Sequence, residues 1–318
     1  MVLAISGCER QYKESKFLMD TIVDVTIVGK RHNVEIAFDE IRRIEDLLSP
    51  YKRDSEISQI NRNSGISGVR VSHETLDVVE QSVRFARMSD SAFDITIGPI
   101  MSLWGFRDGK YRIPSDKEIS EKLRLVGYAN ILIDHARSSI RLALRDMEID
   151  TGAIAVGYAV DSAIQKLKEA RIRNALINAG GEIYAMGSPP GRKAWRIGIK
   201  HPRRGNDLLG IIELKDKAVS TSGDYEKFFE IKGRRYCHII DPRTGKPVQK
   251  IMSVTIVADS TTEADALSTA LFPMGVEKGI RLIESINGAG CVIVAGSSEN
   301  DMKLIISDRL KDKIEFKN

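Results

Sequence analysis

The sequence predicts an α+β protein in which helices pack on antiparallel β-sheets. Residues 21–28 are rich in β-branched side chains, which favour a strand, whereas residues 34–48 repeat apolar residues every three or four positions, which favours a helix. Between residues 175 and 257, short strand-like runs follow one another with no helical pattern between them. Such runs are typical of antiparallel sheets, against which the helices bury their apolar faces.

The first half of the chain is expected to hold three helices and a hairpin. Pro50 ends the first helix, because proline cannot continue one. Ser72 is the expected N-cap of the second helix, and Ser115 with Glu118 has the spacing of a capping box that opens the third. Two strand-like runs within residues 131–144 are expected to form the hairpin.

The second half opens with a helix expected over residues 155–173, whose small first residues leave room for something to approach the backbone. The expected strands after it are residues 175–178, 195–200, 209–214, 227–231, 236–240 and 253–257. Two helices, 262–271 and 276–286, then precede strands at 291–295 and 303–306. Because the sequence contains no repeat, low-complexity tract or linker, we expect one domain over residues 17–318.

Composition and charge exclude several classes of protein. The net charge is only +4 and the basic residues are scattered, whereas nucleic-acid binding needs a concentrated basic surface. Small anionic ligands fit this balance better. The three cysteines include no Cys-x-x-Cys pair, so neither a zinc site nor a disulfide framework is indicated.

The N-terminus carries a possible lipid-attachment signal. The residues before Cys8 read Ile-Ser-Gly, which resembles the lipobox of bacterial lipoproteins, although only seven residues precede this cysteine. Either the recorded start is too late or the match is accidental. If Cys8 is lipidated, residues 9–16 would tether the domain to the extracytoplasmic face of the membrane; a cytoplasmic protein remains the alternative.

Residues 220–223, Ser-Thr-Ser-Gly, form a candidate anion site. Small residues permit a tight turn that points successive amides one way, so Thr221, Ser222 and Gly223 can offer backbone N–H groups and hydroxyls to a phosphate. The alternative is an ordinary turn, followed by a second turn at Asp241-Pro242.

Three residues of the helix expected at 262–271 form a candidate metal site. Asp265, Ser268 and Thr269 are three and four positions apart, so their side chains share one face. Carboxylate and hydroxyl oxygens suit Mg²⁺. Thr262 and Asp265 also have the spacing of a capping motif, however, and Asp265 would then stabilise its own helix and bind no metal.

The chain contains one histidine that is a candidate for proton transfer. His238 lies in a strand-like run, where a histidine can act as a general base or be held by a structural hydrogen bond. Asp241, three residues later, and a metal-bound water are the alternative proton acceptors.

Four stretches occur in an order that resembles the FAD:protein FMN transferase family, often called ApbE. They are DTGAIAVGYAVD at 150–161, NAGGE at 178–182, residues 219–245 and EADALST at 263–269. The resemblance extends from Phe17 to about Pro273 and begins with Phe-x-Met-x-Thr, in which Asp20 replaces the usual glycine. It implies a single domain of T-fold-like architecture.

The resemblance also implies a set of FAD contacts. They would come from Met19, Tyr51, Ala92, Phe93, Asp94, Asp150, Ser222, Gly223, His238 and Ile240. Without the resemblance, Tyr51 is a packing aromatic and residues 92–99 are a strand. Val156 stands where the family commonly has Lys or Glu, and its apolar side chain cannot make the same polar contact.

For the metal, the resemblance implies Mg²⁺ bound by Asp265, Thr269 and the main-chain carbonyl of Ala153. Ser268 stands where some members have an aspartate, so a weaker ligand occupies that position.

The implied reaction is attack of a Thr or Ser hydroxyl of an acceptor protein on the FMN-side phosphorus of FAD, with release of AMP. Acceptors would be flavin-carrying subunits of membrane redox complexes. Three alternatives remain: a metal-dependent FAD pyrophosphatase that uses water as the acceptor, a lipoprotein that binds FAD without turnover, and a generic nucleotide-binding α+β protein.

Overall fold

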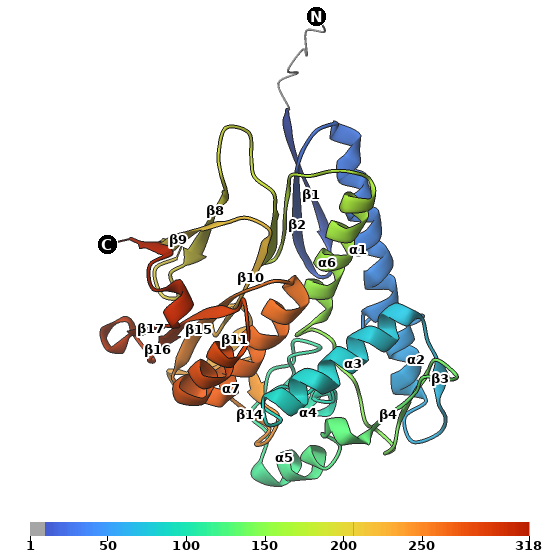
Figure 1. The fold of residues 1–318 in the computed structure, drawn as a ribbon. Helices are drawn as coiled ribbons and strands as arrows, with labels where there is room; N and C mark the ends of the chain where they lie inside the picture. Colours follow the sequence, from blue (N-terminus) through green and yellow to red (C-terminus); the bar gives the residue numbers. More distant parts are fainter. Residues whose placement is uncertain (1–9, 206, 318) are drawn as a thin grey trace, which may run out of the picture.

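The computed structural model describes residues 10–205 and 207–317, and its centre is an eight-stranded sheet (Figure 1). Every neighbouring pair in this sheet is antiparallel. In spatial order the strands are β1 (Gln11–Leu18), β2 (Thr21–Val28), β6 (Ala175–Ala179), β7 (Glu182–Met186), β10 (Lys217–Gly223), β15 (Ile251–Ala258), β16 (Gly290–Ala295) and β17 (Lys303–Ile306).

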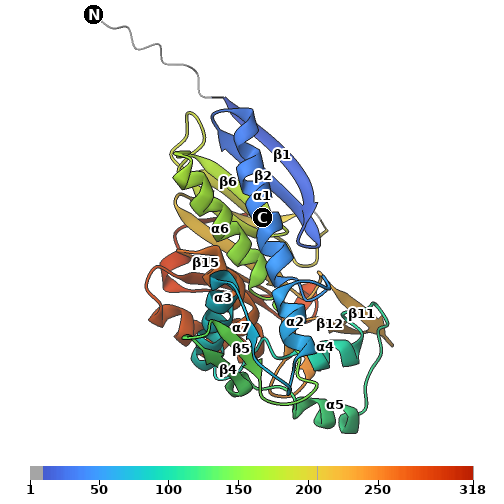
Figure 2. The same ribbon diagram turned by 90° about the vertical axis from the view of Figure 1, so that its right-hand side faces the viewer.

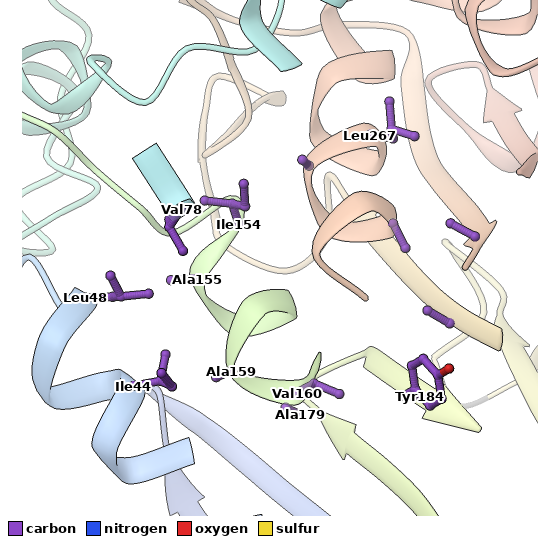
Figure 3. Close-up of a cluster of buried hydrophobic side chains, with 14 of the residues drawn as sticks. Ile44, Leu48, Val78, Ile154, Ala155, Ala159, Val160, Ala179, Tyr184 and Leu267 are labelled. Carbon is purple, nitrogen blue, oxygen red and sulfur yellow. The ribbon is translucent and has the colours of Figure 1, made fainter. Parts of the chain in front are cut away.

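One face of the sheet is covered by three helices, α1 (Val34–Leu48), α6 (Ala155–Glu169) and α7 (Thr261–Ser285). Figures 1 and 2 show α1 and α6 lying side by side over the β1–β2 half. The main hydrophobic core fills the space between these helices and the sheet, and includes Ile44, Ala159, Val160 and Leu267 (Figure 3).

The opposite face is covered by a three-stranded sheet of β18 (Ile314–Phe316), β9 (Leu208–Leu214) and β8 (Trp195–Lys200). Alternation along the central strands explains these layers. In β16, Cys291 and Ile293 belong to the core under the helices, whereas Val292 and Val294 belong to the core under the small sheet. Successive side chains of a strand point to opposite faces, so an all-apolar strand serves two cores.

The remaining elements gather at one end of the molecule, beside and below α7 in Figure 1. The helices are α2 (Glu56–Arg62), α3 (His73–Met88), α4 (Gly98–Trp104) and α5 (Asp116–Leu123), and a small sheet joins β3 (Val69–Arg70), β5 (Ser139–Leu142) and β4 (Ile131–Asp134). Two short hairpins are β11 (Phe228–Ile231) with β12 (Arg234–Cys237), and β13 (Ile240–Asp241) with β14 (Lys246–Pro247). Short 3-10 turns occupy Arg31–Asn33, Tyr128–Asn130, Glu299–Asp301 and Asp308–Leu310.

The predicted α+β class is confirmed, and most predicted elements occur within a few residues of their expected bounds. Ser72 caps α3, and the capping box of Ser115 with Glu118 opens α5. The two predicted late helices are present as α7, which is broken where Gly275 adopts a φ of 73°. None of the helices described here is both long enough and apolar enough to cross a bilayer.

The predicted tether over residues 9–16 is wrong from residue 11 onward. Residues 11–18 form edge strand β1, whose polar side chains alternate between more and less exposed positions. Lys16 forms an ion pair with Glu35 of α1, so this polar strand is part of the domain. Cys8 lies outside the described residues, and its lipidation stays a prediction.

The strand considered for residues 92–99 is also wrong, because this segment is a series of turns from which α4 begins at Gly98. Asp150 is likewise reached through a loop. Trp104, at the end of α4, is buried, and its Nε1 donates a hydrogen bond to the carbonyl of Gly245 at 2.8 Å.

Candidate active site

Helices α6 and α7 approach each other most closely at their N-terminal turns. A Cβ atom on Gly157 would lie 2.5 Å from the carbonyl oxygen of Thr261 and 2.8 Å from the Cβ of Asp265. Real side chains do not pack so closely, so glycine is required for this crossing. The predicted small-residue start of α6 therefore accommodates a second helix.

Each of these helices caps the other. The carboxylate of Asp161 in α6 accepts hydrogen bonds from the amides of Thr261 and Thr262, both at 2.8 Å. In return, Asp265 of α7 accepts one from the amide of Gly157 at 3.0 Å. Ser260 is the N-cap of α7, so the prediction that Asp265 caps its own helix is wrong.

The Gly157 contact leaves two oxygen atoms available for a cation. A helical amide normally donates to the carbonyl four residues earlier, which for Gly157 is Ala153. Because Gly157 donates to Asp265 instead, the Ala153 carbonyl accepts no hydrogen bond from the residues that the structure describes. The other carboxylate oxygen of Asp265 is without a donor within the same residues. A main-chain carbonyl oxygen and a carboxylate oxygen, both without hydrogen-bond donors among the described residues, are ligands that suit a hard divalent cation.

Burial, with a smaller contribution from the nearby Asp161, raises the pKa of Asp265 to about 7, although the hydrogen bond from the Gly157 amide favours the ionised form. An acid that is costly to ionise by itself becomes a good ligand once a cation compensates its charge. Across residues 10–205 and 207–317, no three His, Cys, Asp or Glu side chains gather as a metal site. A metal here would thus depend on carbonyl, hydroxyl and substrate oxygens as well.

The predicted turn at residues 220–223 is wrong, because these residues form the end of strand β10. They pair with β15, with Ser220 opposite Ile256 and Ser222 opposite Val254. The strand contains serines, which are common in turns, because their hydroxyls contact α7. Ser222 Oγ lies 2.8 Å from Ser268 Oγ and 3.3 Å from Thr269 Oγ1.

Ser268 and Thr269 differ in their access to a ligand. Ser268 is fully buried, and its hydroxyl donates to the main-chain carbonyl of Asp265 at 2.9 Å. Thr269 is only half-buried and has Ser222 as its hydroxyl neighbour. The structure thus favours Thr269 as a metal ligand and gives Ser268 the role of orienting the strand against the helix.

Two further acids, which no sequence pattern indicated, lie beside Asp265 and the hydroxyls of β10. Glu182 accepts a hydrogen bond from Ser220 at 3.4 Å, and burial together with Asp265 and Glu226 raises its pKa well above the usual range. Burial and Asp265 raise the pKa of Glu226 to about 8. These raised pKa values mark a region where positive charge would be stabilised.

His238 is held in one tautomer by the main chain. Its Nδ1 lies 3.1 Å from the carbonyl oxygen of Lys227, and because a carbonyl only accepts, Nδ1 carries the proton. Nε2 is then left with a free lone pair. Burial lowers the pKa of His238 to about 4, so the imidazole is neutral near pH 7 and can accept a proton.

Asp241, the second predicted proton acceptor, is engaged elsewhere. Both of its carboxylate oxygens bind the guanidinium of Arg243, at 2.8 and 2.9 Å. Arg243 also donates to the carbonyl of Pro273 in α7. This pairing fixes the turn after β13 and makes Asp241 a poorer base than His238. Ile240 beside it is buried with Ile100 of α4.

Loops from distant parts of the chain meet around Asp150. Its carboxylate accepts a hydrogen bond from Gly152 at 3.0 Å and lies 3.7 Å from the Nε of Arg107. The Arg107 guanidinium also stands 5.6 Å from the ring centre of Tyr51, which is 62% exposed. The structure therefore brings Tyr51 and Asp150 together.

Met19 belongs to the tip of the β1–β2 hairpin, where it and Asp20 have φ values of 56° and 59°. This left-handed conformation is the one that glycine adopts without cost and that aspartate tolerates, which explains how Asp20 can replace a glycine. Asp20 lies 3.1 Å from the Nζ of Lys227, whose carbonyl holds His238. The hairpin tip is thus tied to the histidine segment.

Ala92, Phe93 and Asp94 are buried, so their side chains do not line an open pocket. The carboxylate of Asp94 accepts hydrogen bonds from Thr96 and from the amide of Tyr128. The segment instead holds Asp150 in place. The main-chain carbonyl of Ile95, the residue after Asp94, accepts a hydrogen bond from the Asp150 amide at 2.7 Å. A contact between this segment and a nucleotide would come from its main chain.

Comparison with known proteins agrees with this arrangement. The sequence matches the ApbE family over residues 19–293. The chain belongs to the ApbE family. It is 30% identical to the FAD:protein FMN transferase of Haemophilus influenzae over 315 residues, which cover 92% of this chain and 90% of the relative. A Klebsiella pneumoniae protein of the same name is 31% identical, with 95% and 94% covered.

Solved ApbE structures have the same fold. The ApbE protein of Thermotoga maritima superposes with a TM-score of 0.87 at 35% identity, covering 96% of this chain and 99% of that one. The flavin transferase ApbE of Vibrio cholerae gives 0.84 at 28% identity, covering 95% and 99%. The T-fold-like ApbE architecture expected from the sequence is confirmed.

Within this ApbE chain, the two departures noted in the sequence differ in effect. Val156 lies in the first turn of α6, half-buried against the main core, and supplies no polar atom to the site. Ser268 is absorbed into the contacts between β10 and α7. Val156 therefore contributes only apolar packing, whereas Ser268 still contributes hydrogen bonds.

Arg107 and Asp161 were missed as site residues because nothing in their spacing marks them. Arg107 directly follows the Trp-Gly-Phe block, and Asp161 ends the stretch that begins with Asp150. A usable signal was available for Asp161, since an acid four positions after a glycine of the same helix, here Gly157, lies on the same helix face.

Proposed function

We propose that this chain is a magnesium-dependent FAD:protein FMN transferase. It moves FMN from FAD to a Thr or Ser hydroxyl of an acceptor protein and releases AMP. The observation that carries the proposal is the contact between Gly157 and Asp265, which leaves a carboxylate oxygen and the Ala153 carbonyl without hydrogen-bond donors among the described residues. The names of the relatives in the ApbE family support flavin transfer as the reaction.

Asp265, Thr269 and the Ala153 carbonyl would hold Mg²⁺. Bound there, the ion would neutralise charge on the two phosphates of FAD. Ser222 orients Thr269 through its hydroxyl, and Gly157 orients Asp265 through its amide. Glu182 and Glu226, whose pKa values are raised by burial and by neighbouring acids, would ionise more readily beside a cation, and their charge would then stabilise it.

His238 would accept the proton of the acceptor hydroxyl on Nε2. As the hydroxyl oxygen forms its bond to the FMN-side phosphorus, the bond from that phosphorus to the oxygen of AMP breaks, and AMP leaves with the electron pair. The fixed Nδ1 proton keeps the Nε2 lone pair available. Tyr51 and Asp150 would hold the flavin so that the two reacting groups are in line.

The test is incubation with FAD, Mg²⁺ and an acceptor domain bearing a flavinylation threonine. We expect the acceptor to gain the mass of one FMN and AMP to appear in equal amount. AMP and free FMN with an unlabelled acceptor would instead establish a pyrophosphatase. Bound FAD without products would establish a binding protein.

Replacement of Asp265 tests the metal site. Asp265→Asn keeps the shape and an acceptor for the Gly157 amide but removes the charge, so Mg²⁺-dependent transfer should be lost. Asp259→Asn is the matched control, because Asp259 is an exposed acid near the start of the same helix that pairs with Lys217. Transfer by Asp265→Asn with an unchanged Mg²⁺ requirement would contradict the proposed site.

For the cellular setting, we propose acceptors among the flavin-carrying subunits of membrane redox complexes and attachment of the chain to the extracytoplasmic face through a lipid on Cys8. The Ile-Ser-Gly-Cys motif supports this proposal. Mass spectrometry of the membrane fraction should find Cys8 as an acylated N-terminus; an unmodified Cys8 in the soluble fraction would contradict it.

A further inference from the structure

Arg107 is held in place by the loop that follows α4. Gly105 begins this loop with a φ of 81°, and a Cβ atom there would lie 2.1 Å from the Lys110 carbonyl oxygen, so the loop folds back tightly on itself. Phe106 packs its ring 5.8 Å from that of Phe229 in β11. With both preceding residues fixed, only 16% of the Arg107 side chain is exposed.

The guanidinium of Arg107 lies between two residues that the family resemblance assigns to FAD. Its Nε is 3.7 Å from a carboxylate oxygen of Asp150, and its central carbon is 5.6 Å from the ring centre of Tyr51. One terminal nitrogen, Nη1, forms an ion pair with Glu148. Arg107 is thus the side chain that joins Tyr51 to Asp150.

The donors of this guanidinium are not all used. An arginine offers five N–H groups, and among the described residues only Glu148 accepts one within hydrogen-bond distance, because the Asp150 contact is longer. The remaining N–H donors of the Arg107 guanidinium are therefore available beside the exposed ring of Tyr51. Such a group binds anionic oxygens with charge-assisted hydrogen bonds.

The same region lacks the charged side chain that the family commonly has at position 156. Val156 follows Asp150 by six residues in the sequence and lies in the first turn of α6, and its side chain carries no polar atom. We propose that Arg107 is an FAD-binding residue that supplies the polar contact which Val156 cannot make, while it also positions Asp150 and Tyr51. This inference rests on FAD being the substrate.

The experiment measures the dissociation constant for FAD by flavin fluorescence, without added metal so that no turnover occurs. Arg107→Ala should weaken FAD binding about 10- to 100-fold, as expected for loss of a hydrogen bond to a charged group. Arg107→Lys should recover part of that affinity. Arg112→Ala is the matched control, because Arg112 belongs to the same loop but binds Glu118 and the Leu103 carbonyl, and it should leave the constant within twofold.

A second substitution separates binding from structural support. Adding Val156→Lys to the Arg107→Ala protein should restore at least tenfold of the lost affinity, since it returns a cation to the same region from α6. An Arg107→Ala protein that binds FAD within twofold of the parent, or one whose weakened binding Val156→Lys does not improve, would overturn the proposal. Because affinity is read directly, the result is independent of whether FMN is transferred.

Discussion

The amide of Gly157 donates a hydrogen bond to the carboxylate of Asp265 at 3.0 Å, and this contact joins the first turns of α6 and α7. It has two consequences at once. The absence of a Cβ on Gly157 lets the helices touch, and the direction of its N–H fixes the Asp265 carboxylate while sparing the Ala153 carbonyl. Helix packing and the candidate metal site are therefore one arrangement.

Gly157→Ala should weaken both the packing of α6 against α7 and the candidate metal site. The new methyl group would overlap the Thr261 carbonyl, so the helices must separate, at a cost of about 1–3 kcal/mol in the free energy of unfolding, typical of overpacking. Urea denaturation measures the loss, and Mg²⁺ titration should show weaker binding. Gly279→Ala is the control: its Cβ would meet side-chain atoms alone, of Leu271 at 3.1 Å and of Ile293 at 3.6 Å, and alanine favours the helix. Equal effects of the two substitutions would contradict this account.

Thr269→Val and Ser268→Ala should separate a metal ligand from a packing residue. Thr269→Val keeps the shape but removes the hydroxyl, so we expect the Mg²⁺ concentration for half-maximal transfer to rise at least tenfold. Ser268→Ala removes a buried hydroxyl that bonds Ser222 and the Asp265 carbonyl, so about 1–2 kcal/mol of stability should be lost with little change in Mg²⁺ requirement. The reverse pattern would assign the metal to Ser268.

Two side chains cap the start of α7, and we expect their contributions to the free energy of unfolding to differ. Asp161→Ala removes the acceptor of two main-chain amides and leaves them buried, which should cost about 2–4 kcal/mol. Ser260→Ala removes the acceptor of a single amide, that of Glu263, and should cost about 1 kcal/mol. Thermal and urea unfolding of the two variants would check the order; a larger loss for Ser260→Ala would show that Asp161 is not the principal cap.

The sequence was sufficient to predict the elements with a regular pattern, such as the helices α1 and α3 and the fully buried strand β15. It failed where tertiary contacts override local preference. Ser220 to Gly223 has the composition of a turn, yet pairing with β15 and hydroxyl contacts to α7 hold it as a strand. Residues 11–18 look like a polar tether because an edge strand with partly exposed side chains needs few apolar residues.

The candidate site, like the fold, was predicted only in part. Asp265 and Thr269 were found because helical spacing places them on one face, and Tyr51 and Asp150 because the family resemblance named them. The choice between metal ligand and helix cap for Asp265 could not be made, because the deciding donor, Gly157, is 108 residues away in sequence. Arg107 could not be found for a similar reason, since its partners Tyr51 and Asp150 are brought to it only by the fold.

The stability of this protein should depend on pH through His238. Its pKa is lowered to about 4 in the folded protein, mainly by burial, against 6.5 for an ordinary histidine. Below pH 6.5 the unfolded chain binds a proton that the folded chain does not, so the histidine's contribution is complete above pH 6.5 and is lost as the pH falls towards 4. Because the ring is partly exposed, we expect this contribution to be about 1–3 kcal/mol.

His238→Gln isolates that contribution, since glutamine keeps a hydrogen-bond donor for the Lys227 carbonyl but does not titrate. Urea unfolding at pH 7.5 and pH 5.0 should show the parent losing about 1–2 kcal/mol more than the variant over this interval. Acids with raised pKa values, among them Glu182 and Glu226, act in the opposite direction but equally in both proteins, so the difference between them reports His238. Parallel pH profiles would mean that His238 titrates normally in the folded chain, and a charged imidazole could not then serve as the proton acceptor below neutral pH.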